Sequence, residues 1–245
     1  MPETRDDFSA RIDRLQAELV QQGARVLAMV ELAFDSVFTS DSTKAGEAIR
    51  RDDEIDHADV AIEQETVRLL SEATSATASL DQVQLRRVLM IVKINNEMER
   101  VADVAVDVGE LVLPMAAAPA VPSALAFPPT FRIMANSVIG ILRDTNAAFA
   151  RGSLDVARVV LKSQHAVTEF KAKIVRVAEH DIAAGRMSVD FAFRLHEIAS
   201  LCELIADHCT NIAEQVIYAH TGAIVRHGAT SWVELGTKPG AKSGT

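Results

Sequence analysis

Aromatic residues, cysteines and long hydrophobic runs are all scarce in this chain of 245 residues. Aromatics make up only 4% of the sequence although hydrophobic residues make up 49%, so any core must be built mainly from aliphatic side chains. This composition is too apolar for a disordered chain, and it favours helices packed against helices. No uninterrupted apolar run of about 18 residues occurs, so we expect no membrane-spanning helix and no direct membrane insertion.

Basic residues are also in the minority, with 25 Lys and Arg against 34 Asp and Glu and a net charge of −9. A nucleic-acid partner is therefore not expected, because phosphate backbones are bound by basic surfaces. Cys202 and Cys209 lie on one predicted helix, about 10 Å apart along its axis and too far apart to form a disulfide. Reduced thiols and the absence of a recognisable signal peptide predict a cytoplasmic protein.

Helical periodicity dominates the sequence from about residue 5 to residue 222. It predicts six long helices, at about 5–40, 41–70, 80–113, 130–150, 153–183 and 188–221. Ala48, Ile55, Ile62 and Leu69 recur at heptad spacing in the second helix and should face a core. Five prolines at positions 114–129 predict a stiff connector between two halves.

Two similar acidic motifs indicate that the halves are an internal duplication. Glu99-x-x-x-Asp103 lies late in the third predicted helix, and Glu203-x-x-x-Asp207 follows 104 residues later in the sixth. The starts of the second and fifth helices align at an offset of 112. The expected fold is all-α, with two tandem three-helix bundles. The predicted divisions are repeat 1 at 5–113, a proline-rich connector at 114–129, repeat 2 at 130–222 and a flexible tail at 223–245.

Carboxylates gather on two predicted helices of the first half and form a candidate metal site. Glu99 lies on an otherwise mostly apolar helical line, with Asp103 one turn further on. Asp52, Asp56 and Asp59 border the apolar face of the second predicted helix. Neighbouring carboxylates repel one another, so a bound cation, a basic side chain or solvent must neutralise them. Carboxylate oxygens suit hard or borderline cations.

The second half keeps Glu203 and Asp207 but has fewer acids to join them. At the offset of 112, Gln164 and Thr168 stand where the first half has its first two acids. We therefore expect the first half to bind metal better than the second. His208 is close enough in sequence to reach an ion at the second motif, but a structural role is the simpler interpretation.

The order of helices and the paired motifs resemble the PhoU family of phosphate-signalling proteins over about residues 8–222. The resemblance rests on Glu99-Arg100-Val101-Ala102-Asp103, on Asp52-Asp53-Glu54-Ile55-Asp56 and on the second Glu-x-x-x-Asp motif, where Leu204 replaces the arginine. It implies a cytoplasmic regulator of phosphate uptake that works with a phosphate ABC transporter ATPase and represses a phosphate-sensing histidine kinase. We also expect a homodimer. Some family members carry metal ions, divalent or ferric, on these motifs. The candidate ligands here are Asp52, Asp56, Asp59, Glu99, Asp103, Glu203 and Asp207.

Two other function classes stay open. Glu54-x-x-His57 is half of the signature of a carboxylate-bridged di-iron enzyme, which needs two such motifs, and the sequence has no second copy. A metal-free helical adaptor is the other alternative. No glycine-rich phosphate loop and no nucleophile–base pair is recognisable, so we expect no enzyme. Because the acidic motifs repel a free phosphate anion, the phosphate signal should arrive through a partner.

Overall fold

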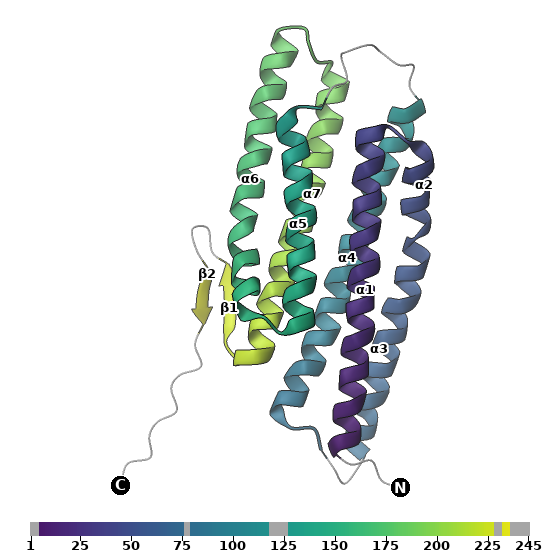
Figure 1. Ribbon diagram of the computed structural model, residues 1–245, viewed down its shortest axis with the longest axis vertical. Coiled ribbons are helices and arrows are strands. Elements are labelled where there is room, and N and C mark those ends of the chain that lie inside the picture. Colours follow the sequence, from purple (N-terminus) through teal and green to yellow (C-terminus); the bar gives the residue numbers. More distant parts are fainter. Residues whose placement is uncertain (1–4, 76–78, 118–126, 228–231, 236–245) are drawn as a thin grey trace, which may run out of the picture.

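The computed structural model describes residues 5–75, 79–117, 127–227 and 232–235. These residues form seven helices and one two-stranded sheet (Figure 1). The helices are α1 (Arg5–Thr39), α2 (Ser42–Arg50), α3 (Asp52–Ser75), α4 (Gln82–Ala117), α5 (Pro129–Arg151), α6 (Leu154–Ala183) and α7 (Val189–Thr221). The strands are β1 (Ile224–His227) and β2 (Trp232–Leu235). The all-α prediction is confirmed. None of the described helices combines the length and apolarity needed to cross a membrane.

The internal duplication is visible in the helix caps. Asp41 caps α2 and Ser153 caps α6, at the offset of 112 that aligns the two halves. The Asp41 carboxylate accepts hydrogen bonds from the N–H groups of Thr43 and Lys44, at 2.9 and 3.2 Å. The Ser153 hydroxyl accepts one from the N–H of Val156 at 3.4 Å. Each cap satisfies helix donors that would otherwise lack partners, so equivalent positions start equivalent helices.

The two halves pack side by side, mainly through α4 against α7 and α1 against α5 (Figure 1). One continuous core of mostly aliphatic side chains runs through both. The predicted heptad positions of α2 and α3 are all buried in it. Phenylalanine rings concentrate where α1, α5 and α7 meet, and they pack against one another at Phe38, Phe127, Phe131 and Phe191. The fold therefore joins the two repeats into one body.

Helix boundaries differ from the predicted ones at two places. The second predicted helix is divided at Arg51 into the short α2 and the longer α3, and the N–H of Arg51 is shared there between the carbonyls of Glu47 and Ala48. The six predicted long helices are thus present, with α2 as a short additional one among the described residues. α4 continues through Pro114 to Ala117, into the predicted connector. A proline removes only one backbone hydrogen bond, and less than one turn of α4 follows it. Residues 118–126 of the connector lie outside the described residues.

The segment at 223–245, predicted as a flexible tail, contains two strands of a β-hairpin that the sequence analysis did not predict. Gly222 ends α7 in the left-handed conformation, with φ 74°, and turns the chain back. β1 then pairs antiparallel with β2, with Val225 opposite Glu234. Val225 is buried, so the hairpin is anchored by apolar packing. Residues 228–231 and 236–245 lie outside the described residues.

Both cysteines are free and buried in α7, as predicted. Burial raises the pKa of the Cys202 thiol, and it raises the pKa of Cys209 to about 12. Such thiols stay protonated and unreactive, so these residues serve packing.

Candidate functional site

The predicted carboxylates of the first half act on one another across α3 and α4. Partial burial and then the nearby charges of Asp56 and Asp103 raise the pKa of Asp52 to about 6. Burial, followed by neighbouring carboxylates, also raises the pKa values of Asp59 and Glu99. The structure thus places the five predicted acids of this half near enough for their charges to act on one another, and these charges are only partly compensated.

One carboxylate oxygen of this acidic face has no partner. Oδ1 of Asp52 is buried, and no donor among the described residues reaches it. Asp59, in contrast, accepts a hydrogen bond of 2.6 Å from Nδ2 of the fully buried Asn95. A buried oxygen without a donor is costly, so a proton or a cation at Asp52 would relieve it.

The equivalent carboxylates of the second half both have protein side chains as partners. Glu203 accepts hydrogen bonds from Nζ of Lys171 at 2.7 Å and from the hydroxyl of Thr168 at 2.8 Å. Nε2 of Gln164 donates to Oδ1 of Asp207. Partial burial acts to raise the pKa of Glu203, but the hydrogen bonds from Lys171 and Thr168 hold it below its ordinary value. Lys171 offsets one of the two charges, so this pair of helices has less need of an ion than the pair in the first half.

Lys171 is the functional difference that sequence reasoning missed. At the offset of 112 it stands in the place of Asp59, so a cation in repeat 2 replaces an acid in repeat 1. Extending the alignment of Gln164 and Thr168 by three residues would have found it. The two repeats have the same fold at this point, but repeat 2 carries much less negative charge there.

The acids of the first half have the chemistry of a metal site, but their side chains do not converge on one point. Their donors are all carboxylate oxygens from two helices, which suits a hard cation, and the orphaned oxygen of Asp52 suits a positive ligand. Within the described ranges, no three His, Cys, Asp or Glu side chains lie close enough together to hold a metal ion. A cation here would require the carboxylates to turn toward it, so the metal site stays a prediction.

A second polar cluster, which the sequence did not predict, joins the two repeats. Oε2 of Glu97 on α4 lies 2.7 Å from Nδ1 of His208 and accepts a hydrogen bond of 3.1 Å from Nδ2 of Asn211, both on α7. The side chains of Glu97 and His208 are only 16% and 10% exposed. Burial acts to raise the pKa of Glu97, but the hydrogen bonds from these partners lower it. His208 thus holds the two halves together, in agreement with its structural interpretation.

The motif of the di-iron alternative does not face a bundle interior. Glu54 and His57 are both exposed. Glu54 pairs with Nε of Arg25 at 3.3 Å, and Nδ1 of His57 contacts the carbonyl of Asp53. Because di-iron carboxylate sites are built from side chains that project inward, these positions do not support that enzyme class.

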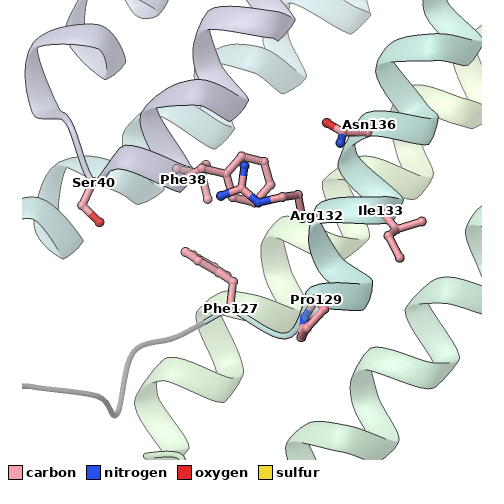
Figure 2. Close-up of a pocket in the computed structure, with 8 residues that line it drawn as sticks. Phe38, Ser40, Phe127, Pro129, Arg132, Ile133 and Asn136 are labelled. Carbon is pink, nitrogen blue, oxygen red and sulfur yellow. The ribbon is translucent and has the colours of Figure 1, made fainter.

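A pocket of about 570 Å³ lies where the end of α1 meets the start of α5 (Figure 2). The guanidinium of Arg132 lies across the ring of Phe38, 3.9 Å from its centroid, and Phe127 lies beside it. Ser40 and Asn136 add polar groups at the rim (Figure 2). Among the described residues, no acid and no nucleophile–base pair lines this pocket, so its described lining offers a contact surface.

Known proteins match most of this chain. A family model described as the PhoU domain matches residues 10–112 and 131–216, so each repeat is matched separately and the β-hairpin lies beyond the match. The phosphate-specific transport system accessory protein PhoU homolog 1 of Thermotoga maritima is 25% identical over 215 residues, which are 88% of this chain and 89% of that protein. The accessory protein PhoU of Escherichia coli is 26% identical over 220 residues, which are 90% and 88% of the two chains.

Solved structures have the same fold. The crystal structure of the phosphate transport system regulatory protein PhoU from Streptococcus pneumoniae matches with a TM-score of 0.79 at 21% identity, covering 89% of this chain and 99% of that chain. PhoU from Pseudomonas aeruginosa matches with a TM-score of 0.78 at 24% identity, covering 88% and 99%. The arrangement of two packed repeats is thus shared with proteins of distant sequence.

Proposed function

Because this chain belongs to the PhoU family, we propose that it is a regulator of phosphate uptake that binds a phosphate ABC transporter ATPase and a phosphate-sensing histidine kinase. The observation that carries the proposal is that each repeat matches the family separately and keeps a Glu-x-x-x-Asp motif on its third long helix. The names of the relatives, accessory proteins of a phosphate-specific transport system, supply the transporter as the partner.

The protein acts in this proposal by association and not by turnover. Its place is the cytoplasmic side of the membrane, where a transporter ATPase is accessible. A net charge of −9 disfavours direct binding to anionic lipid, so the partner brings the chain to the membrane. The signal is then a difference in affinity for two states of that partner.

The proposal includes a metal ion, divalent or ferric, on the acidic face of repeat 1. Asp52, Asp56 and Asp59 of α3 and Glu99 and Asp103 of α4 would hold it. Support comes from the raised pKa values of three of these acids and from the orphaned oxygen of Asp52. A bound cation would neutralise the mutual repulsion and tie α3 to α4. Lys171 makes the corresponding position of repeat 2 a poorer site.

Gene deletion and affinity capture test the regulatory role. Deleting the gene should derepress phosphate-starvation genes in phosphate-replete cells, and a plasmid copy of the intact chain should restore repression. The purified chain should capture a transporter ATPase or a sensor kinase from the same cells, and light scattering should find the predicted homodimer. Normal repression in the deletion strain, together with capture of neither partner, would show that the assignment is wrong.

Elemental analysis of two matched double mutants tests the metal. Glu99→Ala with Asp103→Ala should lower the bound metal more than Glu203→Ala with Asp207→Ala. The reason is that Lys171, Gln164 and Thr168 already satisfy the second pair. Equal losses from both double mutants would contradict the asymmetry between the repeats, and metal-free wild-type protein would remove the metal from the proposal.

A further inference from the structure

A small pocket of about 140 Å³ lies between α1, α4 and α7. It is at the end of the molecule where the first turns of α4 lie near the last turns of α7 (Figure 1). Arg86 and Arg87 of α4 and His220 of α7 line it, together with Gln16 of α1 and an apolar wall. None of the described residues that line it is Asp or Glu, although acids outnumber bases in the chain by 34 to 25. The pocket is therefore a local concentration of cationic and N–H donor groups.

Arg86 provides a donor that the described part of the protein leaves unused. Its Nε is buried and has no hydrogen-bond partner, and its guanidinium makes no ion pair with any described carboxylate. An arginine keeps its charge and carries five N–H donors. Burying such a donor without an acceptor is costly, so an acceptor that enters the pocket gains the full value of the interaction.

Arg87 is held in a fixed orientation at the same pocket. Its Nη2 donates to Oδ1 of Asp13 at 2.6 Å and to Oε1 of Gln16 at 2.7 Å. No partner among the described residues contacts its other N–H groups. Asp13 offsets part of the charge of Arg87, which leaves Arg86 as the uncompensated cation of the pocket.

Two glycines allow the side chains of His220 and Arg86 to approach the backbone closely. Gly152 and Gly222 both have positive φ, 63° and 74°. A methyl group on Gly152 would come within 2.6 Å of the His220 ring, and one on Gly222 within 2.9 Å of Nη1 of Arg86. The turn after α5 and the end of α7 thus place His220 and Arg86 where a side chain at either glycine would displace them.

We propose that this pocket binds a small tetrahedral oxyanion, either inorganic phosphate or the phosphoryl group of a larger molecule. Planar guanidinium groups form paired, charge-assisted hydrogen bonds to such oxyanions. Arg86 and Arg87 belong to repeat 1 and His220 to repeat 2, so the anion bridges the repeats and favours one relative placement of them. The inference goes beyond the regulatory proposal, which assigns no ligand to the chain itself, and it concerns donors remote from the acidic motifs.

Isothermal titration calorimetry of the full chain tests the site, with inorganic phosphate, sulfate and ATP as separate probes. Wild-type protein should bind phosphate, and Arg86→Gln and Arg87→Gln should each weaken binding by about tenfold or more, as expected for the loss of a charge-assisted hydrogen bond. The matched control is Arg158→Gln, which removes an exposed arginine of α6 that pairs with Asp155 and should leave binding unchanged. Circular dichroism checks that each variant is folded, and Arg86→Lys retains the charge if Arg86→Gln does not fold.

The results separate the sources of the anion and the competing structural role of Arg86. Equal binding of phosphate and sulfate that depends on Arg86 and Arg87 identifies a free oxyanion as the ligand. Tighter binding of ATP with the same dependence identifies a nucleotide phosphoryl group. If Arg86 only compensates the carbonyls at the end of α7 near Gly222, none of the probes will bind, or binding will be equal in wild type and both glutamine variants, and the proposal is overturned. A failed gene-deletion test would leave this measurement standing, because it uses the purified chain alone.

Discussion

Replacing Asp52 with asparagine should stabilise the folded protein at neutral and alkaline pH. The pKa of Asp52 rises from 3.8 to about 6, first because the side chain is partly buried and then because Asp56 and Asp103 lie nearby. The unfolded chain therefore loses this proton at lower pH than the folded protein does. As the pH rises from 3.8 to about 6, the folded state binds more protons and its free energy of unfolding falls. Above that range the folded protein carries the full cost of an ionised Asp52, and asparagine removes this cost because it has no charge.

The expected gain is about 1 kcal/mol above pH 7. A shift of this size corresponds to at most about 3 kcal/mol at 1.36 kcal/mol per pKa unit. The Asp52 side chain is only partly buried, and solvent screening reduces the value to about 1 kcal/mol. The second repeat already has an amide at this position. Gln164, which aligns with Asp52, donates a hydrogen bond from its amide to Asp207, which aligns with Asp103.

Urea denaturation followed by far-ultraviolet circular dichroism measures the effect, in the presence of a chelator. Asp52→Asn should raise the free energy of unfolding at about pH 8 and have a much smaller effect at about pH 4. The control is Glu179→Gln, which changes an exposed acid of α6 that is not among the charges acting on Asp52 and should leave the free energy of unfolding nearly unchanged at both pH values. A destabilised Asp52→Asn protein at about pH 8, or equal effects at both pH values, would refute the reasoning.

Two further substitutions probe the contacts that distinguish and join the repeats. Lys171→Met should lower the free energy of unfolding by about 0.5–1 kcal/mol, because Glu203 loses its cation. Unchanged stability in urea denaturation would show that this pair contributes nothing. His208→Ala should cost about 2 kcal/mol, because Glu97 stays partly buried without its main partner. In a double-mutant cycle, adding Glu97→Gln should recover part of the loss, and strict additivity would contradict the pairing. Folding lowers the pKa of Glu97, so its ionised carboxylate stabilises the folded protein above pH 4.5. This contribution to the free energy of unfolding is lost as the pH falls through the pKa that Glu97 has in the folded state.

The sequence by itself determined the helices and their duplication, because these depend on neighbours within a few residues. The apolar period, the caps at Asp41 and Ser153 and the glycine turns at Gly152 and Gly222 are local signals, and the helices begin and end close to where those signals predict. The motif spacing of 104 and the helix offset of 112 also located the acids that face one another in repeat 1. The break at Arg51 and the hairpin after Gly222 lacked a comparable local signal.

Only the tertiary structure decided which charges are neutralised and by what. Lys171 reaches Glu203 across 32 positions of sequence, and His208 reaches Glu97 across 111. The same holds for the pocket at Arg86, which combines residues of α1, α4 and α7. Periodicity states which side of a helix is apolar, but the partner of a polar side chain depends on which helix lies opposite and in what register. For that reason two repeats with the same motif differ in how their acids are compensated, by Lys171 and Gln164 in repeat 2 and by no such partners at the aligned positions of repeat 1.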